Sequence, residues 1–312
     1  MEIVAQSGRK TNDEGRIDFP SSSVVRLATR SVLQSSRARL ASVEDGAITA
    51  SALLGHVLGL TRAQVLARPE QGLTPEQAAT FEALVARAAE GEPLAYLTGR
   101  REFYALDFEV DPSVLVPRPE TELLVDRALA ARPARVLDVG TGSGCIAVTL
   151  AVRLPQAAIT ASDLSPAALA LAGRNAQHHN VGEHITFVLS DLLDAFLPPP
   201  TSHIPPLTSH FDLIAANLPY IDPDELRTLP VARFEPRLAL DGGPGGLALV
   251  ARLLSQAPAV LAPGGQMLLE IGASQGPAAL ALARAAFPAA AVSVQRDMAG
   301  LDRLLVIETK QG

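Results

Sequence analysis

The sequence lacks tryptophan and contains a single cysteine, Cys145, among its 312 residues. One cysteine cannot form a disulfide within the chain, so a disulfide-stapled fold is excluded and a reducing interior fits. No apolar run is long enough to span a bilayer. Residues 1–20 are polar and mixed in charge, without the apolar core of a secretion signal. We therefore expect a cytoplasmic protein with a disordered leader at residues 1–20.

Basic charge is also scarce, since 26 Lys and Arg face 33 Asp and Glu, for a formal net charge of −7. Phosphate recognition relies on Lys and Arg, so the balance does not favour a nucleic acid as the main partner. His178 and His179 are adjacent, and no Cys/His spacing suggests zinc. We expect no direct nucleic-acid, membrane or metal partner. The chain is long enough for two domains.

Residues 21–91 are rich in Ala, Leu and Arg at helical spacing, which predicts a small bundle of short helices. Thr61 and Thr74 are each followed three residues later by Gln, the pattern of a capping box. Its position ahead of the rest of the chain suggests a substrate-docking domain, although such a bundle could serve solubility alone. Residues 92–117 then predict a β-hairpin linker, with strands at 103–110 and 114–116 joined by a turn at 111–113.

Strands and helices alternate through residues 118–312, which predicts an α/β, Rossmann-like domain with a mostly parallel seven-stranded sheet covered on both faces. The last two strands are too close in sequence for a helical crossover, so they should form an antiparallel pair. The predicted strands are 135–139, 158–162, 185–189, 211–216, 266–271, 291–295 and 303–308, with helices such as 165–177 and 246–261. A proline-rich insertion at 194–210 is expected to be a mobile surface segment.

The first of these strands ends in a glycine-rich turn, where an open α/β sheet binds a nucleotide-like cofactor. The turn and its flanks comprise Asp138, Gly140, Thr141, Gly142, Ser143 and Gly144. Asp138 would repel a pyrophosphate and favour a cationic ligand such as a sulfonium. Asp163, after the second strand, can accept both ribose hydroxyls. Asp191 and Leu192, after the third, can meet the adenine amino group and face. Together they predict S-adenosylmethionine; the alternative is an ordinary nucleotide turn with surface or capping aspartates.

A second motif follows the strand at 211–216 and consists of Asn217, Leu218, Pro219 and Tyr220. The Asn217 side-chain oxygen and the Leu218 carbonyl can both accept hydrogen bonds from a planar –NH2 group, while Pro219 ends the strand. Tyr220 supplies a flat wall, and Leu115 of the linker is expected to cover the same pocket. This arrangement predicts methyl transfer to an amide or exocyclic amine nitrogen, with Asn217 also near the cofactor. A plain turn after a strand is the alternative.

These motifs resemble those of class I S-adenosylmethionine-dependent methyltransferases that act on planar nitrogens. Three further runs make the resemblance more specific. They are Leu97-Thr98-Gly99 with Glu102-Phe103, Leu115-Val116-Pro117-Arg118-Pro119-Glu120-Thr121-Glu122, and Leu240-Asp241-Gly242-Gly243 with Gly245-Gly246-Leu247. Together they are similar to the HemK-like (PrmC-type) protein-glutamine N5-methyltransferases. The resemblance covers Val24 to about Glu308. It implies S-adenosylmethionine as cofactor and the glutamine of the Gly-Gly-Gln loop in class I peptide chain release factors as substrate.

The motif at 217–220 departs from that family, which usually carries proline where Leu218 stands. Asn-Leu-Pro-Tyr is typical of ribosomal RNA adenine-N6 dimethyltransferases, so these are the main alternative. The helical domain ahead of the sheet and the acidic charge favour the glutamine methyltransferases. A cofactor-binding scaffold without catalysis is a third possibility.

Overall fold

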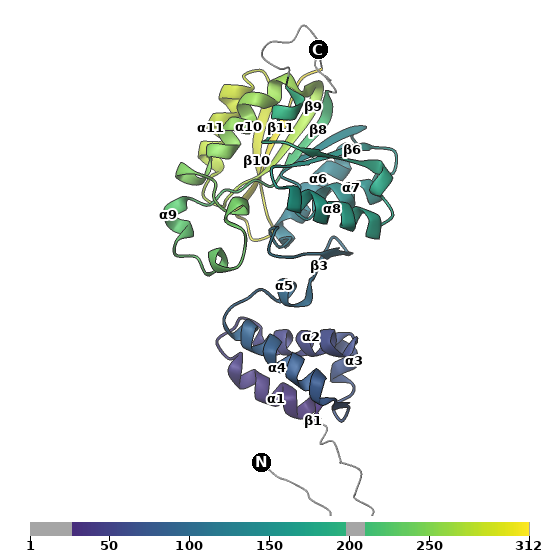
Figure 1. Ribbon diagram of the computed structural model, residues 1–312. Coiled ribbons are helices and arrows are strands. Elements are labelled where there is room, and N and C mark those ends of the chain that lie inside the picture. The colour runs from purple at the N-terminus through teal and green to yellow at the C-terminus, as the bar shows by residue number, and fades with distance from the viewer. Residues whose placement is uncertain (1–26, 198–209, 312) are drawn as a thin grey trace, which may run out of the picture. The chain divides into compact units, whose positions relative to one another are not determined.

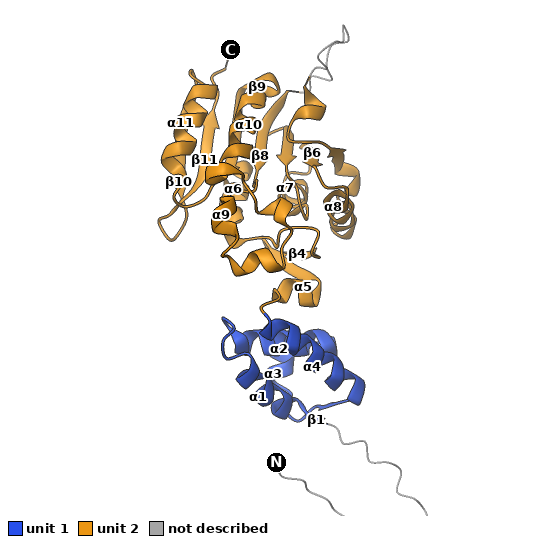
Figure 2. Cartoon of the chain, turned by 60° about the vertical axis from the view of Figure 1, so that its left-hand side comes forward, with its two compact units in different colours: residues 1–90 blue, residues 91–312 orange. Residues whose placement is uncertain are grey.

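The computed structural model describes residues 27–197 and 210–311. The chain divides into two compact units, residues 1–90 and 91–312 (Figure 2). The predicted leader at 1–20 lies outside the described residues, as does most of the predicted insertion at 194–210. At the start of that insertion the structure describes a short 3-10 helix, Asp194–Phe196.

Residues 27–90, the described part of the first unit, form four helices and one short strand pair. The helices are α1 (Thr29–Arg39), α2 (Gly46–Leu58), α3 (Arg62–Leu66) and α4 (Pro75–Ala89), and β1 (Leu27–Ala28) pairs with β2 (Gly72–Leu73). Thr61 and Thr74 each form the predicted capping box with the glutamine three residues on. Each box satisfies two backbone N–H groups that a helix start leaves unpaired.

The second unit begins with α5 (Leu94–Thr98) and a hairpin of β3 (Arg100–Phe103) and β4 (Leu106–Glu109). The predicted positions of the hairpin strands, 103–110 and 114–116, and of the turn between them were wrong. The turn lies at Tyr104 and Ala105, whose φ angles are +52° and +58°. Two consecutive positive φ angles match the two-residue turn that suits a twisted hairpin. Burial of Phe103 and Phe108 against the core offsets the strain. Residues 114–116 are not a strand.

Seven strands of the described residues form one sheet in the order β10-β11-β9-β8-β5-β6-β7 (Figure 1). They are β5 (Arg135–Val139), β6 (Ala158–Asp163), β7 (Ile185–Leu189), β8 (Phe211–Ala216), β9 (Leu261–Glu270), β10 (Ala291–Arg296) and β11 (Asp302–Glu308). Strand β11 runs antiparallel to both of its neighbours, and the other pairs are parallel. The predicted parallel sheet with an antiparallel last strand is confirmed.

Helices cover both faces of this sheet (Figure 1). They are α6 (Glu122–Ala131), α7 (Cys145–Arg153), α8 (Pro166–His178), α10 (Ala248–Gln256) and α11 (Gly276–Ala286), whereas the short α9 (Pro223–Leu226) lies away from the sheet. Side chains alternate between two cores along each strand: Val136 and Leu268 pack with α6 and α7, whereas Leu137 and Leu269 pack with α10 and α11. The same alternation turns Asp138 and Glu270, the next polar residues along these strands, toward the α6 and α7 side.

Candidate active site

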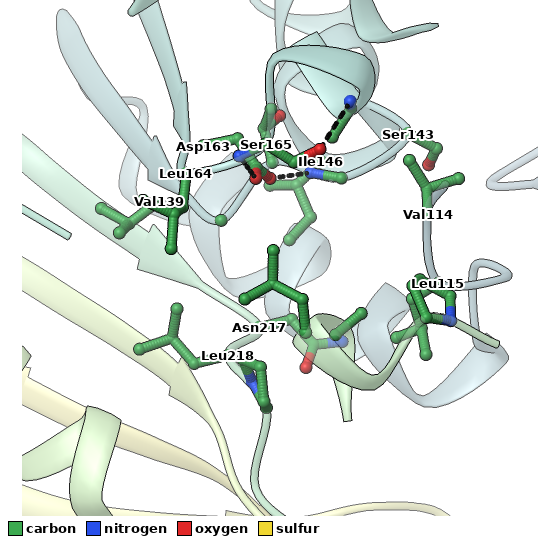
Figure 3. Close-up of a pocket in the computed structure, with 18 of the residues that line it drawn as sticks. Val114, Leu115, Val139, Ser143, Ile146, Asp163, Leu164, Ser165, Asn217 and Leu218 are labelled. Atoms are coloured by element: carbon green, nitrogen blue, oxygen red, sulfur yellow. Dashed lines mark hydrogen bonds between the residues drawn. The ribbon is translucent and has the colours of Figure 1, made fainter. Parts of the chain in front are cut away.

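A cavity of about 430 Å³ opens within the second unit, at the carboxyl ends of β5, β6 and β8 (Figure 3). Ligands of open α/β sheets bind at this edge. The cavity brings together most of the predicted site residues. Those that line it are Leu115, Gly140, Thr141, Gly142, Ser143, Asp163, Asp191, Leu192, Asn217, Leu218 and Pro219. Asp138, Gly144 and Tyr220 are outside this lining.

The glycine turn makes close approaches that side chains would block. Gly144, the residue before α7, has a φ of +81°, and a Cβ there would lie 3.0 Å from the Cβ of Ala172 on α8. Gly140 has a φ of +72°, and a Cβ there would lie 3.1 Å from the Cδ2 of Leu218. The turn therefore packs between α8 and the segment that follows β8, and this leaves its backbone as one wall of the cavity.

Asp138, which was predicted to favour a cationic ligand, lies behind the turn and outside the lining of the cavity. Its Oδ2 accepts hydrogen bonds from Thr141 Oγ1 at 2.6 Å and from the Ala147 amide at 3.2 Å. Its Oδ1 is buried and has no partner among the described residues. Burial raises the pKa of this fully buried carboxyl to about 7. The alternation along β5 explains the placement, because Val139 takes the cavity side.

Asp163 ends β6 and lies at the cavity wall, facing Asn217 and Leu218 across it (Figure 3). Its Oδ2 accepts from the Gly142 amide at 2.9 Å and its Oδ1 from the Ser165 amide at 2.8 Å. Burial raises its pKa, against these backbone hydrogen bonds that lower it. An ionised carboxylate has about four acceptor positions, so the group that orders the turn can still accept two hydroxyl donors.

Asp191 and Leu192 form the next part of the wall. Asp191 accepts a hydrogen bond from Arg252 of α10 at 3.0 Å. Leu192 is buried and has a φ of +50°, an uncommon backbone conformation for a leucine. Sequence reasoning missed Arg252 and Leu249, which also line the cavity. Their spacing of three on an amphipathic helix was the signal that placed them on one face.

Asn217 follows β8 and projects into the cavity with its amide orientation fixed from behind. Its Nδ2 donates to Thr121 Oγ1 at 3.0 Å. Within residues 27–197 and 210–311, no protein donor reaches its Oδ1 by the hydrogen bonds that the structure shows. The side-chain oxygen is therefore the atom that the protein leaves for a ligand, beside the backbone of Leu218.

Tyr220 lies away from the cavity and does not form the predicted flat wall. Its hydroxyl donates to Glu270 Oε1 at 3.4 Å, and its carbonyl accepts from Gln275 Nε2 at 2.8 Å. Burial raises the pKa of Tyr220 to about 12, with the nearby Glu270 carboxylate adding to the effect.

Thr121 and Glu270 were missed in the sequence. Glu270 is only 2% exposed and accepts from Thr121 Oγ1 at 2.6 Å. The available signal was its position, because Glu270 ends a buried strand at the same sheet edge as Asp163. Thr121 follows the proline-arginine-proline run. Nothing in that sequence motif indicates that the Thr121 hydroxyl accepts a hydrogen bond from Asn217.

The segment that contains Leu115 is tied down on both sides of that residue. Tyr96 donates its hydroxyl to the Val114 carbonyl at 2.5 Å. The Val116 amide donates to Glu235 Oε2 at 3.2 Å, and Arg118 pairs with Glu235 Oε1 at 2.5 Å. Glu235 is 4% exposed, so this pair holds the segment in place at the cavity. The predicted cover by Leu115 thus has a structural anchor, although Leu115 is not in a strand.

Metal-ligand clusters and membrane-spanning helices are both absent from residues 27–197 and 210–311. No cluster of three or more His, Cys, Asp or Glu side chains is placed to hold a metal ion. None of the helices there is both long enough and apolar enough to cross a membrane.

Comparison with known proteins agrees with this geometry. Residues 31–99 match the family model of the PrmC N-terminal domain, and residues 119–228 match that of the methyltransferase small domain. The release factor glutamine methyltransferase of Moorella thermoacetica is 42% identical over 284 residues, covering 89% of this chain and 97% of that protein. Its counterpart from Nitratidesulfovibrio vulgaris is 40% identical over 285 residues, covering 88% and 92%.

One solved structure, the release-factor-specific protein-(glutamine-N5) methyltransferase of Alicyclobacillus acidocaldarius, is 28% identical with a TM-score of 0.40, and the match covers 65% of this chain and 99% of that one. We call the turn formed by Asn217, Leu218, Pro219 and Tyr220 the acceptor turn. Together with the sheet order and the glycine turn, it defines the class I S-adenosylmethionine-dependent methyltransferase fold. Within that class, the identity to relatives over nearly their whole length is decisive. The chain belongs to the release factor glutamine methyltransferase family.

Proposed function

We propose that this protein transfers a methyl group from S-adenosylmethionine to the side-chain amide nitrogen of the glutamine in the Gly-Gly-Gln loop of class I peptide chain release factors. The observation that carries the proposal is the pair of acceptors at one cavity wall. Asn217 is held by its Nδ2, which leaves Oδ1 for the substrate beside the Leu218 carbonyl. Two acceptors in a row match the two N–H bonds of a carboxamide.

The cavity fits the proposed cofactor by the chemistry of its walls. Asp163 would accept the ribose hydroxyls, Asp191 would meet the adenine amino group, and the apolar side chains of Leu164 and Leu192 would contact the adenine faces. The backbone of Gly140 belongs to the same wall. When bound, S-adenosylmethionine supplies an electrophilic methyl group on a positively charged sulfur, which carboxylates near the site favour.

The protein's own task is to place a poor nucleophile. A carboxamide nitrogen delocalises its lone pair into the carbonyl, so orientation contributes more than charge. Asn217 Oδ1 and the Leu218 carbonyl accept the two N–H bonds and direct the lone pair into the cavity. Such placement contributes roughly 7–11 kcal/mol in favourable cases. The same acceptors stabilise the positive charge that develops on nitrogen. A strong base is unnecessary because the methylated nitrogen loses its proton readily.

The domain organisation completes the proposal. Residues 21–91 would dock the release factor, residues 92–117 would link the two parts, and residues 118–312 would carry the reaction. Support comes from the separate compactness of residues 1–90 and 91–312 and from the match of residues 31–99 to a domain of this family.

The test uses methyl-labelled S-adenosylmethionine with three acceptors: a purified class I release factor, the same factor with its Gly-Gly-Gln glutamine changed to alanine, and ribosomal RNA. Label should enter the first acceptor alone, and mass spectrometry should place one methyl on the glutamine. Label in RNA would favour the adenine methyltransferase alternative, and no transfer to any acceptor would favour a cofactor-binding scaffold.

A further inference from the structure

We propose that Thr121 and Glu270 are positioning residues that fix the direction of the Asn217 side-chain amide and thereby make it an acceptor toward the substrate. The inference rests on the proposed function and deepens it. It adds two residues outside the acceptor turn. Thr121 lines the cavity and Glu270 lies behind it, and both act on the substrate amide through Asn217.

The argument starts from the polarity of a hydroxyl group, which has one hydrogen to donate. Thr121 Oγ1 lies 2.6 Å from Glu270 Oε2 and 3.0 Å from Asn217 Nδ2. An ionised carboxylate can only accept, so the threonine proton must point at Glu270. The hydroxyl then has only lone pairs to offer Asn217. The amide must therefore present its –NH2 to Thr121 and its oxygen to the cavity.

The surroundings of Glu270 keep it in the accepting role. Tyr220 donates its hydroxyl to the other carboxylate oxygen. Burial raises the pKa of Glu270, whereas the hydrogen bonds from Thr121 and Tyr220 and the charge of Arg303 lower it, and Glu120 raises it. Arg303 is itself held by Asp297 at 3.2 Å. Both hydroxyls donate to this carboxylate, and the positive charge of Arg303 favours its ionised, accepting form.

The consequence concerns the wrong orientation of Asn217. A flipped amide would direct its –NH2 at the –NH2 of the substrate, and two donors would face each other without a shared acceptor. Three segments far apart in sequence contribute to this control: the short 3-10 helix Pro119–Thr121, the turn after β8, and the end of β9. The acceptor turn is thus oriented by its neighbours and not by its own sequence.

The first test compares Thr121→Val with Thr121→Ser in the full-length protein. Valine keeps the shape and removes the hydroxyl, so kcat at saturating release factor should fall roughly 10²-fold, the scale of a misplaced reactant. The dissociation constant for S-adenosylmethionine should stay within about twofold of wild type, since Thr121 makes no hydrogen bond to Asp163 or Asp191, the carboxylates proposed to hold that cofactor. Serine restores the hydroxyl and should recover kcat to within about threefold of wild type.

Thr149→Val is the matched control. Thr149 is also fully buried in the second unit, and its hydroxyl has no partner among the described residues. The substitution should leave both kcat and cofactor affinity unchanged. A second probe, Glu270→Gln, supplies an –NH2 that can face Thr121, which frees the threonine proton to bond the Asn217 oxygen. It should lower kcat without changing cofactor affinity.

A substrate-free readout separates this inference from the proposed function. The side-chain –NH2 resonances of Asn217, assigned with Asn217→Ala, should show slow hydrogen exchange in wild type and Thr121→Ser and fast exchange in Thr121→Val. Wild-type kcat and slow exchange in Thr121→Val, with Asn217→Ala inactive, would overturn the positioning role and leave the proposed function intact. Absence of methyl transfer by the wild type would sink the proposed function, and the exchange data would still decide the positioning role.

Discussion

Asp138→Asn gives a quantitative test of the buried carboxyl behind the glycine turn. The pKa of Asp138 rises from an ordinary 3.8 to about 7 in the folded protein. The folded state therefore binds more protons than the unfolded state between these values. Stability from this group is fully present below the unfolded pKa and is lost as pH rises through the folded pKa. Asparagine cannot ionise, so the variant should lack this loss.

The size of the effect follows from the two pKa values. For one group with pKa 3.8 unfolded and about 7 folded, the unfolding free energy falls by about 3 kcal/mol between pH 5 and pH 8. In the variant, the asparagine oxygen can accept from Thr141 and Ala147, while its –NH2 replaces the unpartnered Oδ1. That buried donor costs about 1–3 kcal/mol, but the cost is independent of pH. The change in unfolding free energy with pH therefore differs between wild type and variant only by the ionisation of Asp138.

Urea unfolding at pH 5 and pH 8 measures this change in unfolding free energy for the wild type and for Asp138→Asn. The chain has no tryptophan, and its three tyrosines, Tyr96, Tyr104 and Tyr220, all lie in residues 91–312. Tyrosine fluorescence therefore follows the unit that contains Asp138. Asp163 and Glu270, whose pKa values are also raised, are present in both proteins. Between pH 5 and pH 8, the free energy of unfolding should fall by about 3 kcal/mol more in the wild type than in the variant. Equal losses in the two proteins would refute the reasoning.

The remaining predictions concern the acceptor turn and the first unit. Asn217→Ala should lower kcat at least about 10²-fold with little change in cofactor affinity, as radiolabel transfer and calorimetry would show, and wild-type turnover would contradict it. Gly246→Ala should destabilise the second unit more than Gly245→Ala in thermal unfolding. Both glycines have positive φ, but only at Gly246 would a Cβ meet the Tyr220 carbonyl, at 2.2 Å, so equal effects would argue against that contact. Removal of residues 1–90 should spare cofactor binding and abolish turnover on the intact release factor; full turnover would reject the docking role.

Much of the fold could be predicted from the sequence because the central strands of the sheet are buried on both faces. Five of the seven predicted strands begin at the observed residue, and three of these, 135–139, 185–189 and 211–216, also end there. Periodicity could not locate the hairpin turn, since Tyr104 and Ala105 adopt positive φ without glycine or asparagine to signal it. Packing of Phe103 and Phe108 decides that turn, and this information lies in the tertiary structure.

The sequence allowed us to predict which segments form the cavity, but not the directions of their side chains. Residues at the carboxyl ends of parallel strands must lie at one edge, so Asp163, Asp191 and Asn217 were accessible to sequence reasoning. Which way each side chain points is set by strand alternation and by distant partners. Asp138 faces the helices for the first reason, and Asn217 depends on Thr121 for the second. A hydrogen bond across 96 positions leaves no local pattern in the sequence.

Leu218 shows why the form of the acceptor motif does not decide the substrate. The group proposed to bind the amide is the backbone carbonyl, which leucine and proline both carry, and Pro219 biases the residue before it toward an extended backbone in either case. The leucine side chain is 5% exposed and packs over the glycine turn, with its Cδ2 3.1 Å from where a Cβ of Gly140 would lie. The leucine therefore contributes a side-chain contact with the glycine turn and retains the backbone carbonyl that would accept the amide N–H. Substrate choice between a glutamine amide and an adenine must then come from what surrounds the turn, and here the family of the whole chain favours glutamine.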